Sequence, residues 1–103
     1  MQVQVEESVL KFIFSLQPNT QAKYQHVRDL LEQFGYELSM PLSKKVASGL
    51  FELRIRGQQE VRIFYVFYKN SAYLLHGFVK KSQKIPSKEI QLALTRKKLL
   101  TGV

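Results

Sequence analysis

The sequence predicts an α+β domain in which an antiparallel sheet of three or four strands follows N-terminal helices and precedes a C-terminal helix. Three patterns support this class. Apolar residues recur at helical spacing before residue 35, apolar and polar residues alternate between residues 50 and 79 with short interruptions, and a proline begins a last helical segment. We expect the helices to pack on one face of the sheet and to leave a basic face opposite.

Two helices are expected in the N-terminal third of the chain. The apolar positions of the first are Val9, Phe12, Ile13 and Leu16, and Pro18 ends that segment. The second helix is expected to have its cap at Asn19 or Thr20 and to stop at Gly35. Its apolar stripe consists of Tyr24, Val27, Leu30, Leu31 and Phe34. Residues 36–49 are expected to form a connection.

Three strands and a final helix are expected after this connection. The expected strands are residues 50–56, 60–68 and 73–79. The second of these is almost entirely β-branched and aromatic, as is typical of a central strand covered on both faces. Short turns separate the strands, so consecutive strands must be antiparallel neighbours. The last helix is expected to open at Pro86 or Ser87 and to run to about Leu100.

The composition limits the classes of protein that are possible. With 103 residues and 45% hydrophobic residues, the chain is expected to form one folded domain, residues 1–103. It contains no cysteine, so disulfides and thiolate metal sites are excluded. There is no apolar run of membrane-spanning length and no signal-peptide pattern, so we expect a cytoplasmic protein without a membrane partner.

The net charge of +8 is distributed unevenly along the chain. Residues 1–43 contain three basic and five acidic residues, whereas residues 44–103 contain thirteen basic and three acidic ones. Solubility alone does not require such segregation. A polyanionic partner is therefore expected, with nucleic acid favoured over an anionic membrane.

Arg62 is the unusual residue of the predicted central strand, because its neighbours are apolar. A buried arginine requires an anion or an acidic partner. Two interpretations are equally open from the pattern. Arg62 either binds an anionic ligand or forms a structural ion pair, for example with Glu52 on the neighbouring strand.

Side chains alternate between the two sides of a strand. On the first expected strand, one side carries Glu52, Arg54 and Arg56. On the third, one side carries Leu74, His76, Phe78 and Lys80. If Arg62 faces the same way, guanidiniums, an imidazole and a carboxylate gather on one sheet face. Guanidiniums stabilise charge on a phosphate, and an imidazole or carboxylate can accept a proton from a 2′-hydroxyl. His76 alone is weak evidence, because a lone strand histidine is more often packed or exposed. No phosphate loop, metal-ligand spacing or serine-nucleophile motif is present, so neither a metal nor a cofactor is expected.

Three stretches occur in a familiar order: Gly49-Leu-Phe-Glu-Leu-Arg54, Val61-Arg-Ile-Phe-Tyr65, and Leu75-His-Gly-Phe-Val-Lys-Lys81, followed by Lys84, Pro86, Glu89 and Ile90. In this order they resemble the phage-derived HigB-like branch of the RelE/ParE toxin superfamily, over about residues 44–97. The resemblance implies a RelE-like fold and the toxin of a type II toxin–antitoxin system. Such a toxin is a metal-independent endoribonuclease that cuts messenger RNA on the ribosome, and an antitoxin, often a helix-turn-helix protein, neutralises it.

The resemblance also suggests roles for individual residues. Arg62 matches the strand arginine that contacts the scissile phosphate, Lys80 and Lys81 match a basic pair at the end of the last strand, and Arg54 matches a basic position after Glu-Leu. Ile85 departs from the threonine that often precedes the proline, so Ser87 is expected to cap the last helix instead.

Together, the residue pattern and the resemblance define two sets of candidate site residues. The candidate catalytic residues are Arg62, Lys81, His76 and Glu52, and the candidate RNA-binding residues are Arg54, Arg56, Lys80, Lys84, Lys44 and Lys45. The alternatives are a ParE-like gyrase inhibitor and a non-catalytic basic RNA-binding module.

Overall fold

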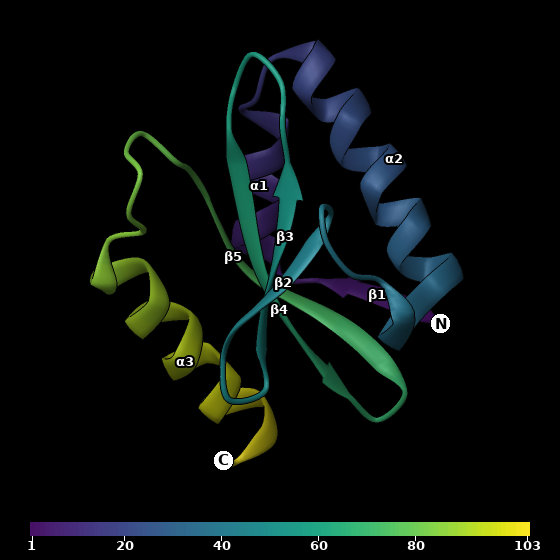
Figure 1. Cartoon of the computed structure of the whole chain (residues 1–103). Coiled ribbons are helices and arrows are strands. Elements are labelled where there is room, and N and C mark those ends of the chain that lie inside the picture. The colour runs from purple at the N-terminus through teal and green to yellow at the C-terminus, as the bar shows by residue number, and fades with distance from the viewer.

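The computed structural model describes all 103 residues and has the predicted α+β class. Its elements are β1 (Gln2–Val5), α1 (Glu7–Phe14), α2 (Pro18–Phe34), the short 3-10 helix η1 (Gly35–Glu37), β2 (Ser43–Ala47), β3 (Leu50–Ile55), β4 (Val61–Tyr68), β5 (Ser71–Val79) and α3 (Ser87–Thr101) (Figure 1). None of the helices combines the length and the hydropathy that a membrane span requires.

The sheet is mixed and has five strands in the order β1-β5-β4-β3-β2. The three predicted strands form its antiparallel centre as β3, β4 and β5. The expectation of three or four purely antiparallel strands is corrected, because β1 pairs parallel to β5 at one edge and β2 pairs antiparallel to β3 at the other. Both missed strands are short edge strands with exposed polar residues, so neither shows a long apolar alternation.

The helices cover both faces of the sheet, so the expectation that they lie on one face is wrong. The main core packs Val9, Ile13 and Leu31 of α1 and α2 against residues such as Leu53 and Ile63. Figure 1 shows α3 on the side of the sheet opposite α2.

A second, smaller core lies beneath α3. Ala93 of this helix is fully buried against a cluster that includes Leu50, Phe64, Val66 and Phe78. Because β4 is apolar on both of its faces, its sequence cannot show which face each helix covers. Because α3 covers part of the face that was expected to be basic, the basic residues are restricted to the end of the sheet that α3 leaves open.

Two helix starts also differ from the expectation. Helix α2 begins at Pro18 with Gln17 at its N-cap, rather than at Asn19 or Thr20. Helix α3 has Pro86 at its N-cap and no side-chain cap hydrogen bond, so Ser87 does not replace the missing hydroxyl. Proline suits a helix start, since the first turn needs no amide donor there.

A β-bulge changes the side-chain alternation in β5. Phe64 pairs with His76, whereas Tyr65 pairs with Leu74, so Leu75 is the additional residue. Leu74 consequently joins the main core, and its predicted place on the same face as His76 is wrong.

We expect Gly77→Ala to destabilise the fold, because a Cβ atom at Gly77 would lie 2.6 Å from Cδ2 of Phe12. Overpacking of this kind costs about 1–3 kcal/mol, which thermal or urea unfolding will measure. Gly57→Ala is the matched control, since its Cβ would meet only the flexible end of Lys23. Adding Phe12→Leu to Gly77→Ala should restore part of the loss. Equal stability of the two single variants would contradict this packing.

Candidate nucleic-acid interface

The β3–β4 pair brings the charged residues of two strands onto one sheet face. Arg54 and Arg62 are directly opposite in the antiparallel register, so their side chains point to the same side. Glu52, two residues before Arg54, shares that side. The face that the strand patterns indicated for these three residues therefore forms in the folded chain.

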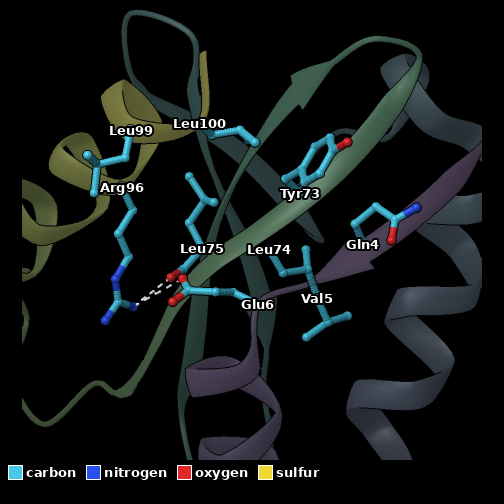
Figure 2. Close-up of a pocket in the computed structure, with 9 residues that line it drawn as sticks. All are labelled: Gln4, Val5, Glu6, Tyr73, Leu74, Leu75, Arg96, Leu99 and Leu100. Atoms are coloured by element: carbon cyan, nitrogen blue, oxygen red, sulfur yellow. Dashed lines mark hydrogen bonds and ion pairs between the residues drawn. The ribbon is translucent and has the colours of Figure 1, made fainter. Parts of the chain in front are cut away.

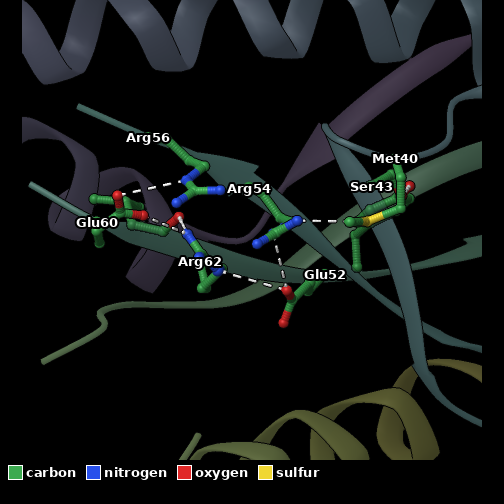
Figure 3. A network of polar contacts seen from close by, with 9 residues as sticks. Met40, Ser43, Glu52, Arg54, Arg56, Glu60 and Arg62 are labelled. Carbon is green, nitrogen blue, oxygen red and sulfur yellow. Dashed lines mark hydrogen bonds and ion pairs between the residues drawn. The ribbon is translucent and has the colours of Figure 1, made fainter. Parts of the chain in front are cut away.

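Glu52 lies between the two arginines. Its Oε1 is 3.5 Å from Nε of Arg54 and 3.5 Å from Nε of Arg62, as the dashed lines in Figure 3 show. The side chains of Arg62 and Glu52 are only 2% and 5% exposed. Yet Glu52 Oε2 and both Nε atoms are buried without a hydrogen-bond partner. The single Glu52 carboxylate thus neutralises the two guanidiniums only in part. Three polar atoms of the three side chains are left without a hydrogen bond.

Glu60 holds the other end of the Arg62 guanidinium. Arg62 Nη1 donates to Glu60 Oε2 at 3.2 Å and to the Val61 carbonyl at 3.1 Å, and Arg56 Nε lies 3.5 Å from Glu60 Oε1. Partial burial opposes ionisation of Glu60, but the Arg62 hydrogen bond and the charges of Arg56 and Arg62 lower its pKa below the usual 4.5. Glu60 is therefore a carboxylate at neutral pH.

A cavity of about 510 Å³ opens beside this network, and we call it the basic cavity. Its lining residues are all polar or charged: Arg54, Arg56, Glu60, Arg62, Lys80, Lys81, Ser82 and Gln83. The Lys80 amide donates to the Glu60 carbonyl at 2.7 Å, which holds the chain after β5 beside the start of β4. Five cationic side chains and one carboxylate make the cavity a site for an anion.

The chain matches the family described as "Phage derived protein Gp49-like (DUF891)" over residues 11–98. It belongs to the Gp49-like family. This is a RelE-like toxin family of toxin–antitoxin systems, with which the observed fold agrees. Membership is consistent with a toxin-like module, and a toxin-like family implies an antitoxin as partner. No protein with a curated description shows significant similarity to the chain.

His76 of the Gp49-like protein lies outside the basic cavity. Its Nε2 is 3.1 Å from Glu89 Oε1 on α3, and its ring stacks on Phe78 at 5.9 Å. It shares the sheet face of Arg62, but α3 covers it. The predicted placement of His76 on the sheet face of the arginines is therefore correct, but His76 does not line the basic cavity.

The remaining candidate lysines, Lys44, Lys45 and Lys84, do not line the basic cavity. Lys44 pairs with Glu52 in the register and so points to the same face, whereas Lys45 pairs with Phe51 and points to the other. Lys84 is exposed in the loop before α3. These positions can contribute to the long-range field but not to the cavity wall.

Sequence reasoning missed Glu60, Ser82 and Gln83 in the wall of this cavity. Glu60 precedes Arg62 by two positions, the spacing of side chains on one face of a strand, and that signal was present in the sequence. Ser82 and Gln83 carry no such pattern, since they belong to an irregular loop.

A separate apolar groove of about 440 Å³ lies between the β1–β5 edge and the end of α3 in the Gp49-like fold (Figure 2). At one end of it, Arg96 Nη1 donates to the Leu75 carbonyl at 2.7 Å and lies 3.5 Å from Glu6 Oε2. The groove shares no residue with the basic cavity. No group of three histidine, aspartate or glutamate side chains gathers at metal-binding distance.

Glu60→Gln should lower the melting temperature at pH 7, and the difference from the parent should shrink as the pH falls below about 4.5. A carboxyl with a folded-state pKa below its unfolded value stabilises the folded state above the unfolded pKa, and this contribution is lost as the pH falls through the folded pKa. Thermal melts from pH 7 to pH 3 test this. Glu7→Gln, which breaks the exposed pair with Lys11, should change little at any pH. A Glu60→Gln deficit that persists unchanged at pH 3 would rule out the electrostatic cause.

Proposed function

We propose that this Gp49-like protein is the toxin of a type II toxin–antitoxin system and a ribosome-dependent endoribonuclease that cuts messenger RNA during translation. We further propose that residues 1–103 form one toxin domain of the HigB-like branch. One observation supports this above all: the nearly buried guanidinium of Arg62 lines a cavity with four other cationic side chains. Such a concentration of positive charge suits a phosphodiester whose negative charge increases in the transition state.

In this proposal the scissile phosphate occupies the basic cavity. The 2′-oxygen bonds to phosphorus, the bond from phosphorus to the 5′-oxygen breaks, and a proton moves from the 2′-hydroxyl to the leaving 5′-oxygen. Arg62 and Lys81 stabilise the added charge on the phosphoryl oxygens, so the chain's own cations perform the task that a metal performs in other nucleases. Arg54, Arg56 and Lys80 hold the neighbouring backbone.

The carboxylates have different roles in this scheme. Glu60 is the one carboxylate that lines the cavity, and in this scheme it accepts the 2′-hydroxyl proton. Glu52 does not line the cavity and lies between two guanidiniums, which fits a positioning residue for Arg62 and Arg54. His76, bound to Glu89 beneath α3, positions that helix and does not reach the phosphate.

Arg62→Lys should lower transcript cleavage in a translation extract by at least about 100-fold, because lysine keeps the charge but loses the planar fork of donors. Growth arrest on expression should be lost in parallel. Arg28→Lys is the matched control, since Arg28 pairs with Glu32 on α2, away from the cavity. Arg62→Ala also leaves Glu52 with one fewer partner and should cost about 3–5 kcal/mol of stability, so melts must accompany each assay.

A folded Arg62→Lys protein that cuts at the parental rate would disprove the assignment of Arg62. A parental protein that binds RNA but never cuts it would favour the non-catalytic module. Growth arrest through gyrase without transcript cleavage would favour the ParE-like alternative.

Removing the charges of Lys80 and Lys81 should weaken RNA binding and flatten its dependence on salt. For every phosphate of a single strand that the protein no longer neutralises, the slope of log affinity against log salt falls by about 0.7, so Lys80→Gln with Lys81→Gln should lower it by about 1.4. The charge-matched control replaces Lys11 and Lys69, which are exposed and outside the cavity, with glutamine. Fluorescence anisotropy with a labelled RNA between about 50 and about 300 mM salt measures both slopes. Identical slopes for the two double variants would show that only net charge matters.

A further inference from the structure

A second cavity adjoins the basic cavity, and we call it the α2 groove. It has a volume of about 490 Å³ and is lined by Ala22, Lys23, His26, Val27, Pro41, Leu42, Arg54 and Arg56. Arg54 and Arg56 also line the basic cavity, so these two side chains separate adjoining spaces. A ligand that occupies one space can extend past them into the other.

The groove exists because β2 covers only part of the edge of β3. The register of the two strands ends with Ser43 opposite Leu53, and the Arg54 amide then donates to the Leu42 carbonyl at 2.8 Å. The chain before Leu42 turns away toward α2. The last residues of β3 are thereby left facing a space between this loop and the helix.

Lys23 spans this space from the helix. Its Nζ donates to the Arg56 carbonyl at 2.8 Å, and a Cβ atom at Gly57 would lie 2.9 Å from the same nitrogen. The missing side chain at Gly57 therefore lets Lys23 bridge α2 and the end of β3. This bridge connects the two walls of the groove.

We infer that the α2 groove binds an unpaired nucleobase of the RNA strand whose neighbouring phosphate lies in the basic cavity. This inference rests on the proposed function, and it specifies where the base next to the bound phosphate is held. The base faces would contact Val27, Leu42 and the Arg54 side chain, which is 15% exposed and has Nη1 3.4 Å from Met40 Sδ. Proteins recognise single-stranded RNA by such stacking on arginine planes and apolar side chains.

The polar rim of the groove gives the edge of the base hydrogen-bonding partners. Lys23 supplies donors, and exposed His26 supplies a ring nitrogen that donates or accepts. A cavity with apolar walls and a few polar groups at its rim is the usual form of a site for a flat heteroaromatic ligand. In this inference His26 selects the base.

Chemical-shift mapping of the full chain tests the position of the base. Inorganic phosphate should move the amide signals of Arg62 and residues 80–83. A nucleoside monophosphate and a short single-stranded RNA should in addition move those of Ala22, His26 and Leu42. A response to the monophosphate but not to the RNA would identify a site for free nucleotides and overturn the inference.

Ala22→Phe should fill the groove without replacing any residue of the basic cavity. With the base excluded from the groove, RNA binding should weaken by at least about fivefold, and the phosphate-induced shifts should stay unchanged. His26→Ala, at an exposed position without folding risk, should weaken binding and change which base is preferred. Gln33→Phe, an exposed position on the same helix outside the groove, is the matched control.

Parental RNA affinity in Ala22→Phe and His26→Ala, or base-dependent shifts confined to the basic cavity, would overturn the inference. The proposed function is tested by a separate assay, which measures transcript cleavage in a translation extract. If the parent cuts transcripts while both groove variants bind and cut like it, only the inference fails. If the parent neither binds RNA nor cuts transcripts, both fail.

Discussion

The cluster of the buried Glu52 and Arg62 with the partly buried Arg54 is the constraint on which the functional end of this protein depends. The Arg62 guanidinium is kept beneath the surface of an apolar sheet because carboxylate oxygens of Glu60 and Glu52 lie 3.2 Å and 3.5 Å from it. The Glu52 carboxylate also lies 3.5 Å from Nε of Arg54. That carboxylate does not use all of the hydrogen-bonding capacity of the cluster. The pairing fixes both arginines at the wall of the basic cavity.

The rest of the fold supports this cluster. The antiparallel register sets Arg54 opposite Arg62, and on the same face α3 covers Phe64 and also Phe78, which lies opposite Arg62 on β5. The sheet face is thus divided into an apolar part beneath a helix and a charged part open to a ligand. The loop after β5 completes the charged part, because the Lys80 amide is bound to the carbonyl of Glu60.

Much of the candidate site could be predicted because strands alternate with a period of two. Glu52, Arg54 and Arg56 belong to one face by spacing alone, and Arg62 attracts attention as a charge in an apolar strand. The prediction of which side chains line the site failed at two places, at the β-bulge in β5 and where α3 packs on the sheet. The bulge turned Leu74 to the main core, and α3 bound His76 through Glu89. Neither event leaves a mark in local spacing, since each depends on contacts between distant segments.

The sequence by itself determined the α+β class, the three central strands, the helices and the concentration of positive charge after residue 43. These depend on local periodicity, turn residues and composition, which each segment contains independently of the others. Only the tertiary structure decided the parallel pairing of β1, the side that α3 covers and the adjoining of the basic cavity with the α2 groove. These features depend on how whole elements pack, and a strand that is apolar on both faces, as β4 is, accepts a helix on either side.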